Sequence, residues 1–240
     1  MSSIGSNLQE VKRRMASACT AAGRNAEILT RAPSMPFPGS LALLAVSKTF
    51  PAEAVREAHA AGQQAFGENY VQEALSKIEA LADLRPQLQW HLIGPLQSNK
   101  TRGVAEVFDW VHSVDRLKVA QRLSEQRPAT LPPLQVCLQV NISGEASKSG
   151  FAAHEVLAAA QAVAALPRLQ LRGLMAIPEP AGDFEAQRQP HRALQELLTA
   201  LNAQGLQLDT LSMGMSADLE AAVAEGASLV RVGTAIFGRR

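Results

Sequence analysis

The chain has 240 residues, of which 47% are hydrophobic, and its 23 Lys+Arg nearly balance its 22 Asp+Glu. The net charge of +1 argues against nucleic-acid binding, because nucleic-acid-binding proteins usually carry a basic patch or stripe. A balanced surface also gives no reason to expect an anionic membrane as partner. The length is close to the roughly 250 residues of a (β/α)8 barrel.

The N-terminal sequence MSSIGSNLQEVKRRM lacks the apolar core of a secretion signal. No run of about 20 apolar residues is present, so we expect no transmembrane helix. Cys19 and Cys137 are too few for a disulfide framework, and they form no CxxC motif for zinc or redox chemistry. We therefore expect a cytoplasmic protein with two free thiols.

The chain is expected to open with an amphipathic helix. Asn7 can cap it, and Glu10 three residues later would complete a capping box. Residues spaced by three and four form its apolar face, namely Leu8, Val11, Met15 and Cys19. Three prolines then mark the segment Arg31–Ser40 as a loop.

From residue 41 short apolar runs alternate with helical patterns. The expected strands are Leu41–Val46, Gln64–Gly67, Leu88–Ile93, Phe108–His112, Leu134–Ile142, Leu169–Ala176, Leu208–Ser212 and Ser228–Val232. The expected helices begin near Pro51 and then span Tyr70–Leu81, Gln97–Val104, Asp115–Gln126, Ala152–Leu166, Phe184–Ala203 and Ser216–Ala224.

Eight repeated βα units imply a parallel sheet and suggest that it closes into a barrel. We therefore predict one α/β domain over residues 1–240, with an extra helix within 1–32 and a single TIM-type (β/α)8 barrel over 41–240. A doubly wound open sheet is the alternative. The first βα turn, Val46–Thr49, has no glycine-rich phosphate loop, which disfavours that fold.

In a TIM barrel the active site lies at the carboxyl ends of the strands, and Lys48 directly follows the first of them. An amine there can condense with an aldehyde once burial or a nearby cation lowers its pKa. A solvated surface lysine is the alternative interpretation.

Two turns after the last two strands favour the functional interpretation. Ser212–Ser216 is a glycine-containing turn, and Ser216 can cap the next helix, which has Asp218 and Glu220 in its first turn. Such a turn offers free backbone N–H groups to a phosphate. Val230–Thr234 ends the eighth strand with a glycine and a hydroxyl, and loops after strands 7 and 8 are the recurrent phosphate site of this fold.

Seven segments, in order, resemble the YggS/PROSC family of pyridoxal phosphate homeostasis proteins. They are Ala45–Thr49 (AVSKT), Phe66–Tyr70 (FGENY), His91–Lys100 (HLIGPLQSNK), Ser147–Gly150 (SKSG), Gly173–Ile177 (GLMAI), Ser212–Ser216 (SMGMS) and Val230–Gly238 (VRVGTAIFG). The resemblance runs from about residue 40 to the C-terminus. It implies a fold related to the N-terminal barrel of alanine racemase, with pyridoxal 5'-phosphate (PLP) as cofactor.

The resemblance also implies a role for each matching residue. Lys48 would form the Schiff base with PLP. Three positions would bind the phosphate, namely Ser216, Gly233 and Thr234. Arg231 would face the pyridine nitrogen, while Asn69 and Met213 would line the pocket. Because an arginine can only donate a hydrogen bond to that nitrogen, the ring would stay unprotonated and would stabilise a carbanion weakly.

The function that the resemblance implies is intracellular PLP homeostasis and carriage, without substantial turnover and with no residue assigned as catalytic. A PLP-dependent racemase of the alanine racemase type is one alternative. That enzyme takes a catalytic tyrosine from a C-terminal β-domain, whereas this chain ends at Arg240 and its one tyrosine is Tyr70. A Schiff-base aldolase is a second alternative, although its lysine usually lies on a later strand. We expect a monomer that passes PLP to PLP-dependent apo-enzymes.

Several further residues carry weaker signals. Phe50 stands where family members often have a lysine, so any role of that cation is in doubt here. His91 and His112 are expected as hydrogen-bonded residues at the barrel rim or as proton shuttles, and their spacing predicts no metal site. Glu68 is a candidate general base or loop tie. Lys148, in the loop 143–150, is a candidate for binding spare phosphate or for PLP transfer.

Overall fold

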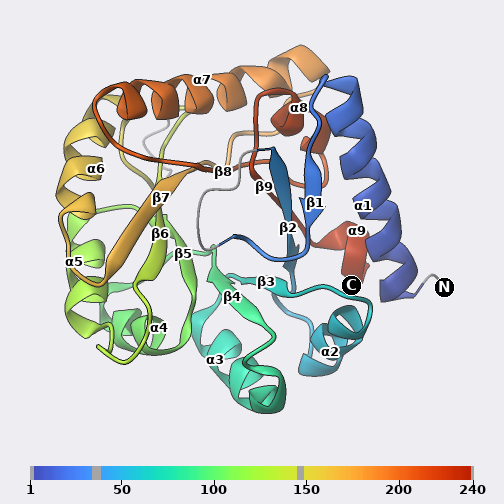
Figure 1. Ribbon diagram of the computed structural model, residues 1–240, viewed down its shortest axis with the longest axis horizontal. Coiled ribbons are helices and arrows are strands. Elements are labelled where there is room, and N and C mark those ends of the chain that lie inside the picture. The colour runs from blue at the N-terminus through green and yellow to red at the C-terminus, as the bar shows by residue number, and fades with distance from the viewer. Residues whose placement is uncertain (1–2, 34–38, 145–148, 239–240) are drawn as a thin grey trace.

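A closed parallel barrel organises the molecule (Figure 1). The computed structural model describes residues 3–33, 39–144 and 149–238. Each strand pairs with the next, and the first barrel strand also pairs with the last, Ala42 standing opposite Leu229. The barrel strands are β2 (Ser40–Val46), β3 (Ala65–Glu68), β4 (Gln89–Leu92), β5 (Trp110–Val114), β6 (Leu134–Gln139), β7 (Leu169–Met175), β8 (Thr210–Ser212) and β9 (Leu229–Val232). The predicted TIM-type barrel is confirmed, and the open doubly wound alternative is wrong.

Helices surround the barrel as an outer layer (Figure 1). They are α1 (Ile4–Ala21), α2 (Ala52–Ala60), α3 (Val71–Ala80), α4 (Thr101–Val107), α5 (Leu117–Gln126), α6 (Val156–Ala164), α7 (Phe184–Ala203), α8 (Leu219–Ala224) and α9 (Thr234–Phe237). Short 3-10 turns lie at Ala82–Leu84, Ser98–Lys100 and Ala153–Glu155. None of the helices that the structure describes is both long enough and apolar enough to cross a membrane.

The barrel strands are buried on both faces, and alternate side chains belong to different cores. On β2, Ala42, Leu44 and Val46 pack in the barrel interior, whereas Leu41, Leu43 and Ala45 pack against the helices. Successive side chains of a strand point to opposite faces, so this division follows from the strand period of two. The same alternation decides which polar residues reach the barrel mouth.

The N-caps of two helices differ from the sequence prediction. Helix α1 begins at Ile4, and Ser3 is its N-cap, since the Ser3 hydroxyl accepts a bond from the Ser6 amide. The predicted cap, Asn7, therefore lies inside the helix. Helix α8 begins at Leu219 with Asp218 as its N-cap, so Ser216 lies in the preceding turn.

The sequence analysis missed one strand, β1 (Glu27–Leu29). It pairs in parallel with Ser40–Ala42 at the start of β2. There it fills a gap, because β2 and β3 pair only near their carboxyl ends, at Ala45 and Val46. The three residues of β1 are exposed or partly exposed and lie close to a proline-rich loop, so their sequence shows no strand pattern.

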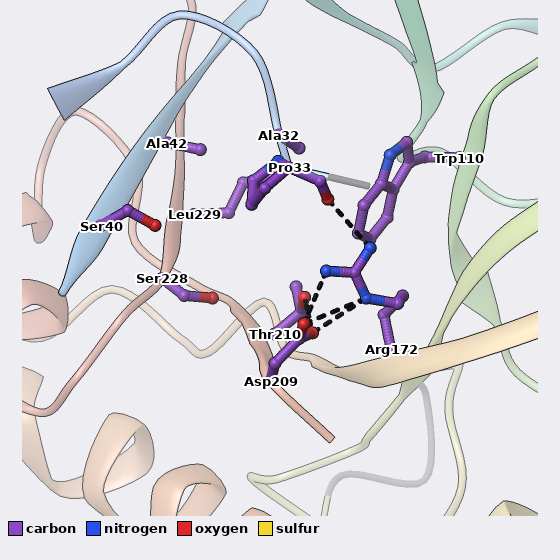
Figure 2. Close-up of a pocket in the computed structure, with 10 residues that line it drawn as sticks. All are labelled: Ala32, Pro33, Ser40, Ala42, Trp110, Arg172, Asp209, Thr210, Ser228 and Leu229. Atoms are coloured by element: carbon purple, nitrogen blue, oxygen red, sulfur yellow. Dashed lines mark hydrogen bonds and ion pairs between the residues drawn. The ribbon is translucent and has the colours of Figure 1, made fainter. Parts of the chain in front are cut away.

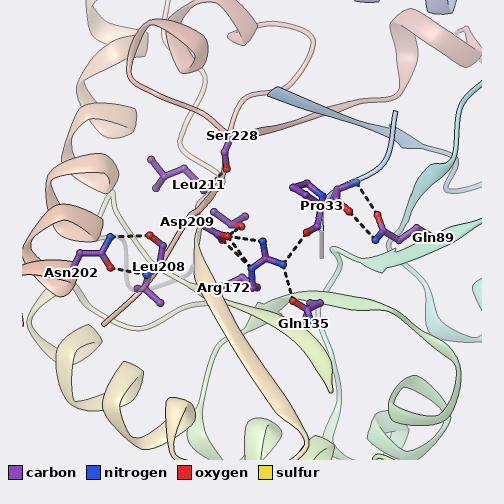
Figure 3. A network of polar contacts seen from close by, with 11 residues as sticks. Pro33, Gln89, Gln135, Arg172, Asn202, Leu208, Asp209, Leu211 and Ser228 are labelled. Carbon is purple, nitrogen blue, oxygen red and sulfur yellow. Dashed lines mark hydrogen bonds and ion pairs between the residues drawn. The ribbon is translucent and has the colours of Figure 1, made fainter. Parts of the chain in front are cut away.

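Arg172 closes the amino-terminal end of the barrel. Its guanidinium forms an ion pair with Asp209 (2.6 Å) and donates to Gln135 Oε1 (2.8 Å) and the Pro33 carbonyl (2.9 Å; Figure 3). It also lies 4.9 Å from the centre of the Trp110 ring. The cavity beside it measures about 30 Å³, room for about one or two water molecules (Figure 2). The cavity beside Arg172 therefore has no room for a ligand much larger than water.

Candidate functional site

A cavity of about 750 Å³ opens at the carboxyl end of the barrel. Its described lining is Val46, Lys48, Thr49, Phe50, Asn69, Ile93, Ile177, Met215, Ser216, Ala217, Arg231, Gly233, Thr234 and Gly238. Six of the seven residues predicted from the sequence therefore lie together, although they come from the ends of four different strands. A cavity of this size suits a small organic ligand.

Met213 is the predicted residue that the structure does not bring to the cavity. Ser212 is the last residue of β8 and points into the barrel, where it contacts His112 and Arg231. The next side chain must point the other way, and Met213 is fully buried in the core under the helices. Met215 lines the cavity instead.

Lys48 lies exposed at the end of β2, and its backbone is held on both sides. The carbonyl of Ser47 accepts a bond from Lys77 Nζ (2.8 Å), and the amide of Thr49 donates to Glu73 Oε1. Thr49 adopts a left-handed backbone, with φ of 68°. These bonds fix where the Lys48 side chain starts.

Glu68 lies behind the barrel wall and not in the cavity. It accepts bonds at Oε1 from Lys77 Nζ and from the Ser47 hydroxyl, both at 2.6 Å. Burial raises the pKa of Glu68, against the lowering effect of Lys77. The side chains of Glu68 and Lys77 are 0% and 4% exposed, so this ion pair ties β3 to α3 and the end of β2. The general-base role considered for Glu68 has no geometric support.

The loop after β8 (residues 213–218) and the turn after β9 (residues 233–234) form one wall of the cavity. Gly214 permits the close packing of the loop, because its φ is 89° and a Cβ there would lie 2.5 Å from Ala222 Cβ. The Arg231 amide donates to the Gly214 carbonyl (3.0 Å), which joins the loop to β9. Within the described structure no hydrogen bond uses the amides of Ser216 and Ala217, so both remain available to an anion.

Arg231 forms the floor of the cavity and is held by fixed acceptors. Nη1 donates to the Ser212 hydroxyl (2.8 Å), and Nη2 donates to the Ala176 carbonyl (2.8 Å). Burial lowers the pKa of Arg231 to about 10, so the guanidinium is still cationic at neutral pH. Nearby, Asn69 Oδ1 is buried and has no partner among the described residues. The cavity therefore offers a fixed cation and an unused acceptor.

A chain of hydrogen bonds runs from Arg231 down the barrel axis. His112 Nδ1 lies 2.7 Å from the Ser212 hydroxyl, His112 Nε2 lies 2.9 Å from His91 Nδ1, and His91 Nε2 lies 3.0 Å from Gln89 Oε1. Both histidines are fully buried and lie below the predicted rim position. Neither lines the cavity.

In this series of hydrogen bonds, only one assignment of donors and acceptors is consistent. Gln89 exchanges two bonds with the Ala32 backbone, accepting at Oε1 and donating from Nε2, which fixes its amide orientation. His91 must then donate to Gln89, His112 donates to His91, and Ser212 donates to His112. Each neutral imidazole supplies one donor and one acceptor. Burial lowers the pKa of His112 to about 3 and that of His91 well below its usual range, as this arrangement requires.

Phe50 and Lys148 are two further residues that the sequence analysis singled out. Phe50 lines the mouth, and its ring centre lies 5.2 Å from that of Phe237, so an apolar pair occupies the place of the family's usual cation. Lys148 lies outside the described residues.

Comparison with known proteins gives the class of the molecule. The family model described as "Alanine racemase, N-terminal domain" matches residues 35–240. An alanine racemase from Corynebacterium glutamicum has the same fold, with a TM-score of 0.66 over 99% of this chain and 61% of that one, at 17% identity.

Relatives of much higher identity give the particular family. A pyridoxal phosphate homeostasis protein of Pseudomonas aeruginosa is 62% identical over 100% of this chain and 97% of its own length. Its counterpart in Escherichia coli K12 is 51% identical over 100% and 98%. The solved structure of PipY from Synechococcus elongatus with PLP bound is 38% identical, with a TM-score of 0.76 over 93% of this chain and 100% of that one. The chain belongs to the family of pyridoxal phosphate homeostasis proteins.

The buried histidines predict an acid-sensitive fold. Between pH 6.5 and the lower folded-state pKa of His112, the unfolded chain binds a proton that the folded chain does not. The free energy of unfolding should therefore fall as the pH drops below about 6.5, by up to about 1.4 kcal/mol per pH unit for this residue. Urea unfolding at pH 7, 6 and 5.5 measures the slope. His112→Gln should reduce it, and an unchanged slope would contradict the neutral, buried assignment.

The ion pair behind Lys48 predicts a stability effect. Lys77→Met leaves the Glu68 carboxylate buried without its cation. We expect a loss of about 3–5 kcal/mol in the free energy of unfolding, measured by urea denaturation. The double variant Lys77→Met/Glu68→Gln should lose less, because no unpaired charge remains. Lys118→Met, at an exposed lysine, is the matched control. Equal losses in the single and double variants would count against an ionised pair.

Proposed function

We propose that this protein binds PLP as a Schiff base on Lys48 and acts in PLP homeostasis and carriage. The observation that carries the proposal is the position of the Lys48 amine in the same cavity as the Arg231 cation and the loop amides. The PipY structure, 38% identical to this chain, contains PLP, and the relatives from P. aeruginosa and E. coli are named for PLP homeostasis.

The described residues fit the cofactor group by group. A phosphate suits the loop amides together with the hydroxyls of Ser216 and Thr234, near Gly233. Arg231 would donate to the pyridine nitrogen, and Asn69 would use its free oxygen at the ring edge. When bound, PLP supplies an electrophilic aldehyde and a ring that can accept electrons.

The same residues favour carriage over turnover. Because Arg231 stays cationic and can only donate, it would leave the pyridine nitrogen unprotonated, which makes the ring a weak electron acceptor. Lys48 and Arg231 are the ionisable residues of the described lining, and Tyr70 is not part of it. A racemase needs a second acid or base opposite its lysine, so the racemase alternative lacks a group in this part of the chain.

We also propose that the protein is a cytoplasmic monomer that passes PLP to PLP-dependent apo-enzymes. Cys19 and Cys137 are both free and buried, as expected of a protein in a reducing compartment.

The visible absorption spectrum tests the anchor. Wild-type protein mixed with PLP should show a band that borohydride abolishes, and peptide mapping should place the reduced adduct on Lys48. Lys48→Ala should lose the band, whereas Lys118→Ala, which removes an exposed lysine on α5, should keep it. A wild-type protein that cannot be loaded with PLP would overturn the proposal.

Exchange of the α-proton of alanine with deuterated solvent separates carriage from racemisation. We expect the PLP-loaded protein to leave the α-proton signal at the level seen with Lys48→Ala plus free PLP. Exchange that depends on Lys48 and exceeds that level would favour the racemase alternative. Proton NMR measures both samples.

A further inference from the structure

Helix α1 contacts both loops that face the cavity, although it precedes the barrel in the chain (Figure 1). Arg14 Nη1 donates to the Ser216 carbonyl (2.8 Å), and Asn7 Nδ2 donates to the Ile236 carbonyl (2.8 Å). These residues are seven positions apart, so they lie two turns apart on one helix face. The family model begins at residue 35 and does not include this helix.

The bond from Arg14 fixes the orientation of a peptide group in the loop after β8. A trans peptide is planar, and its C=O and N–H point in opposite directions. The Ser216 carbonyl points to Arg14 on α1, so the amide of Ala217 points away from α1, and Ala217 lines the cavity. No other described hydrogen bond uses the Ser216 carbonyl or the Ala217 amide. The turn itself is closed by the bond from the Asp218 amide to the Met215 carbonyl, and Arg14 adds the one described hydrogen bond to its central peptide group.

Arg14 also balances charge next to this loop. Its guanidinium makes a bidentate ion pair with Glu220, with Nε–Oε1 and Nη2–Oε2 distances of 2.5 Å. Glu220 lies in the first turn of α8, directly after the loop. Without Arg14, a phosphate at the loop would face that carboxylate without a neighbouring cation.

The turn after β9 is held in a similar way. Thr234, which lines the cavity, begins the four-residue helix α9, and the Ile236 carbonyl lies near its end. A carbonyl in the last turn of a helix has no partner within the helix. Asn7 supplies one, so α1 holds α9 near its C-terminal end, next to Gly238, which also lines the cavity.

We propose that Arg14 and Asn7 of α1 are positioning residues for the phosphate group of PLP, which they would never touch. The inference rests on the proposed function, and it assigns to α1 the orientation of the loop amides. It also implies reciprocity: bound phosphate should strengthen the docking of α1 on the barrel.

The ratio of two affinities tests this role. PLP and pyridoxal share the aldehyde and the ring, but pyridoxal lacks the phosphate. Absorbance titration should show that Arg14→Gln raises the Kd for PLP about tenfold while changing the Kd for pyridoxal less than about twofold. Arg13→Gln is the matched control, since the Arg13 side chain is 69% exposed and, among the described residues, pairs with Glu10 on the same helix.

Three outcomes are distinguishable. A wild-type protein that binds neither compound overturns the proposed function, and this inference with it. If wild type binds PLP and Arg14→Gln behaves like Arg13→Gln, or loses PLP and pyridoxal equally, the positioning role is wrong and the proposed function stands. Should Arg14→Gln fail to fold, as judged by its thermal transition, Asn7→Ala takes its place with the same expected selective loss of PLP.

Discussion

Each strand of the barrel sends one side chain inward and the next outward, and this alternation determines what each polar residue at the strand ends can do. Directly after β2, Ser47 faces outward and Lys48 faces the cavity. At the end of β3, Glu68 faces outward, and the next residue, Asn69, faces the cavity. The outward residues join Lys77 in a buried network, while the inward ones line the cavity. Two adjacent residues thus take a structural role and a binding role because the strand period is two.

The barrel interior below the cavity holds a series of polar side chains among apolar ones, and burying polar groups is costly unless they are paired. The chain from Arg231 through Ser212 and the two histidines to Gln89 meets this requirement with both imidazoles neutral. A hydroxyl that donates becomes a better acceptor, so the bond from Ser212 to His112 strengthens the bond from Arg231 to Ser212. This series of hydrogen bonds consequently holds the Arg231 guanidinium in place. The guanidinium keeps its positive charge at neutral pH despite its burial.

Sequence patterns were sufficient for features that depend on local periodicity. The barrel and the bounds of α7 follow from apolar runs and helical spacing. The six predicted residues around one cavity were assigned by the family resemblance, and each of them lies after an apolar run. Met213 was misplaced because its motif lies just beyond the strand, where a single position reverses the side chain. Arg14 bonds to Ser216, Lys77 to Ser47 and His112 to Ser212, and these partners are 202, 30 and 100 residues away in the chain. No local pattern indicates such contacts.

The polar groups of the cavity are held firmly in place, but few of them could transfer protons. Its unbonded loop amides belong to a loop that is joined to β9 and to Arg14, its cation is buried and bonded to fixed acceptors, and its lysine starts from a peptide segment held on both sides. Catalysis by proton transfer would need a second titratable group near the lysine, with a pKa close to the working pH. The described lining instead surrounds Lys48 with amides, hydroxyls and apolar side chains such as Phe50 and Ile177. Such an environment would hold an aldehyde and a phosphate and would supply few groups for proton transfer, as the proposed carrier function requires.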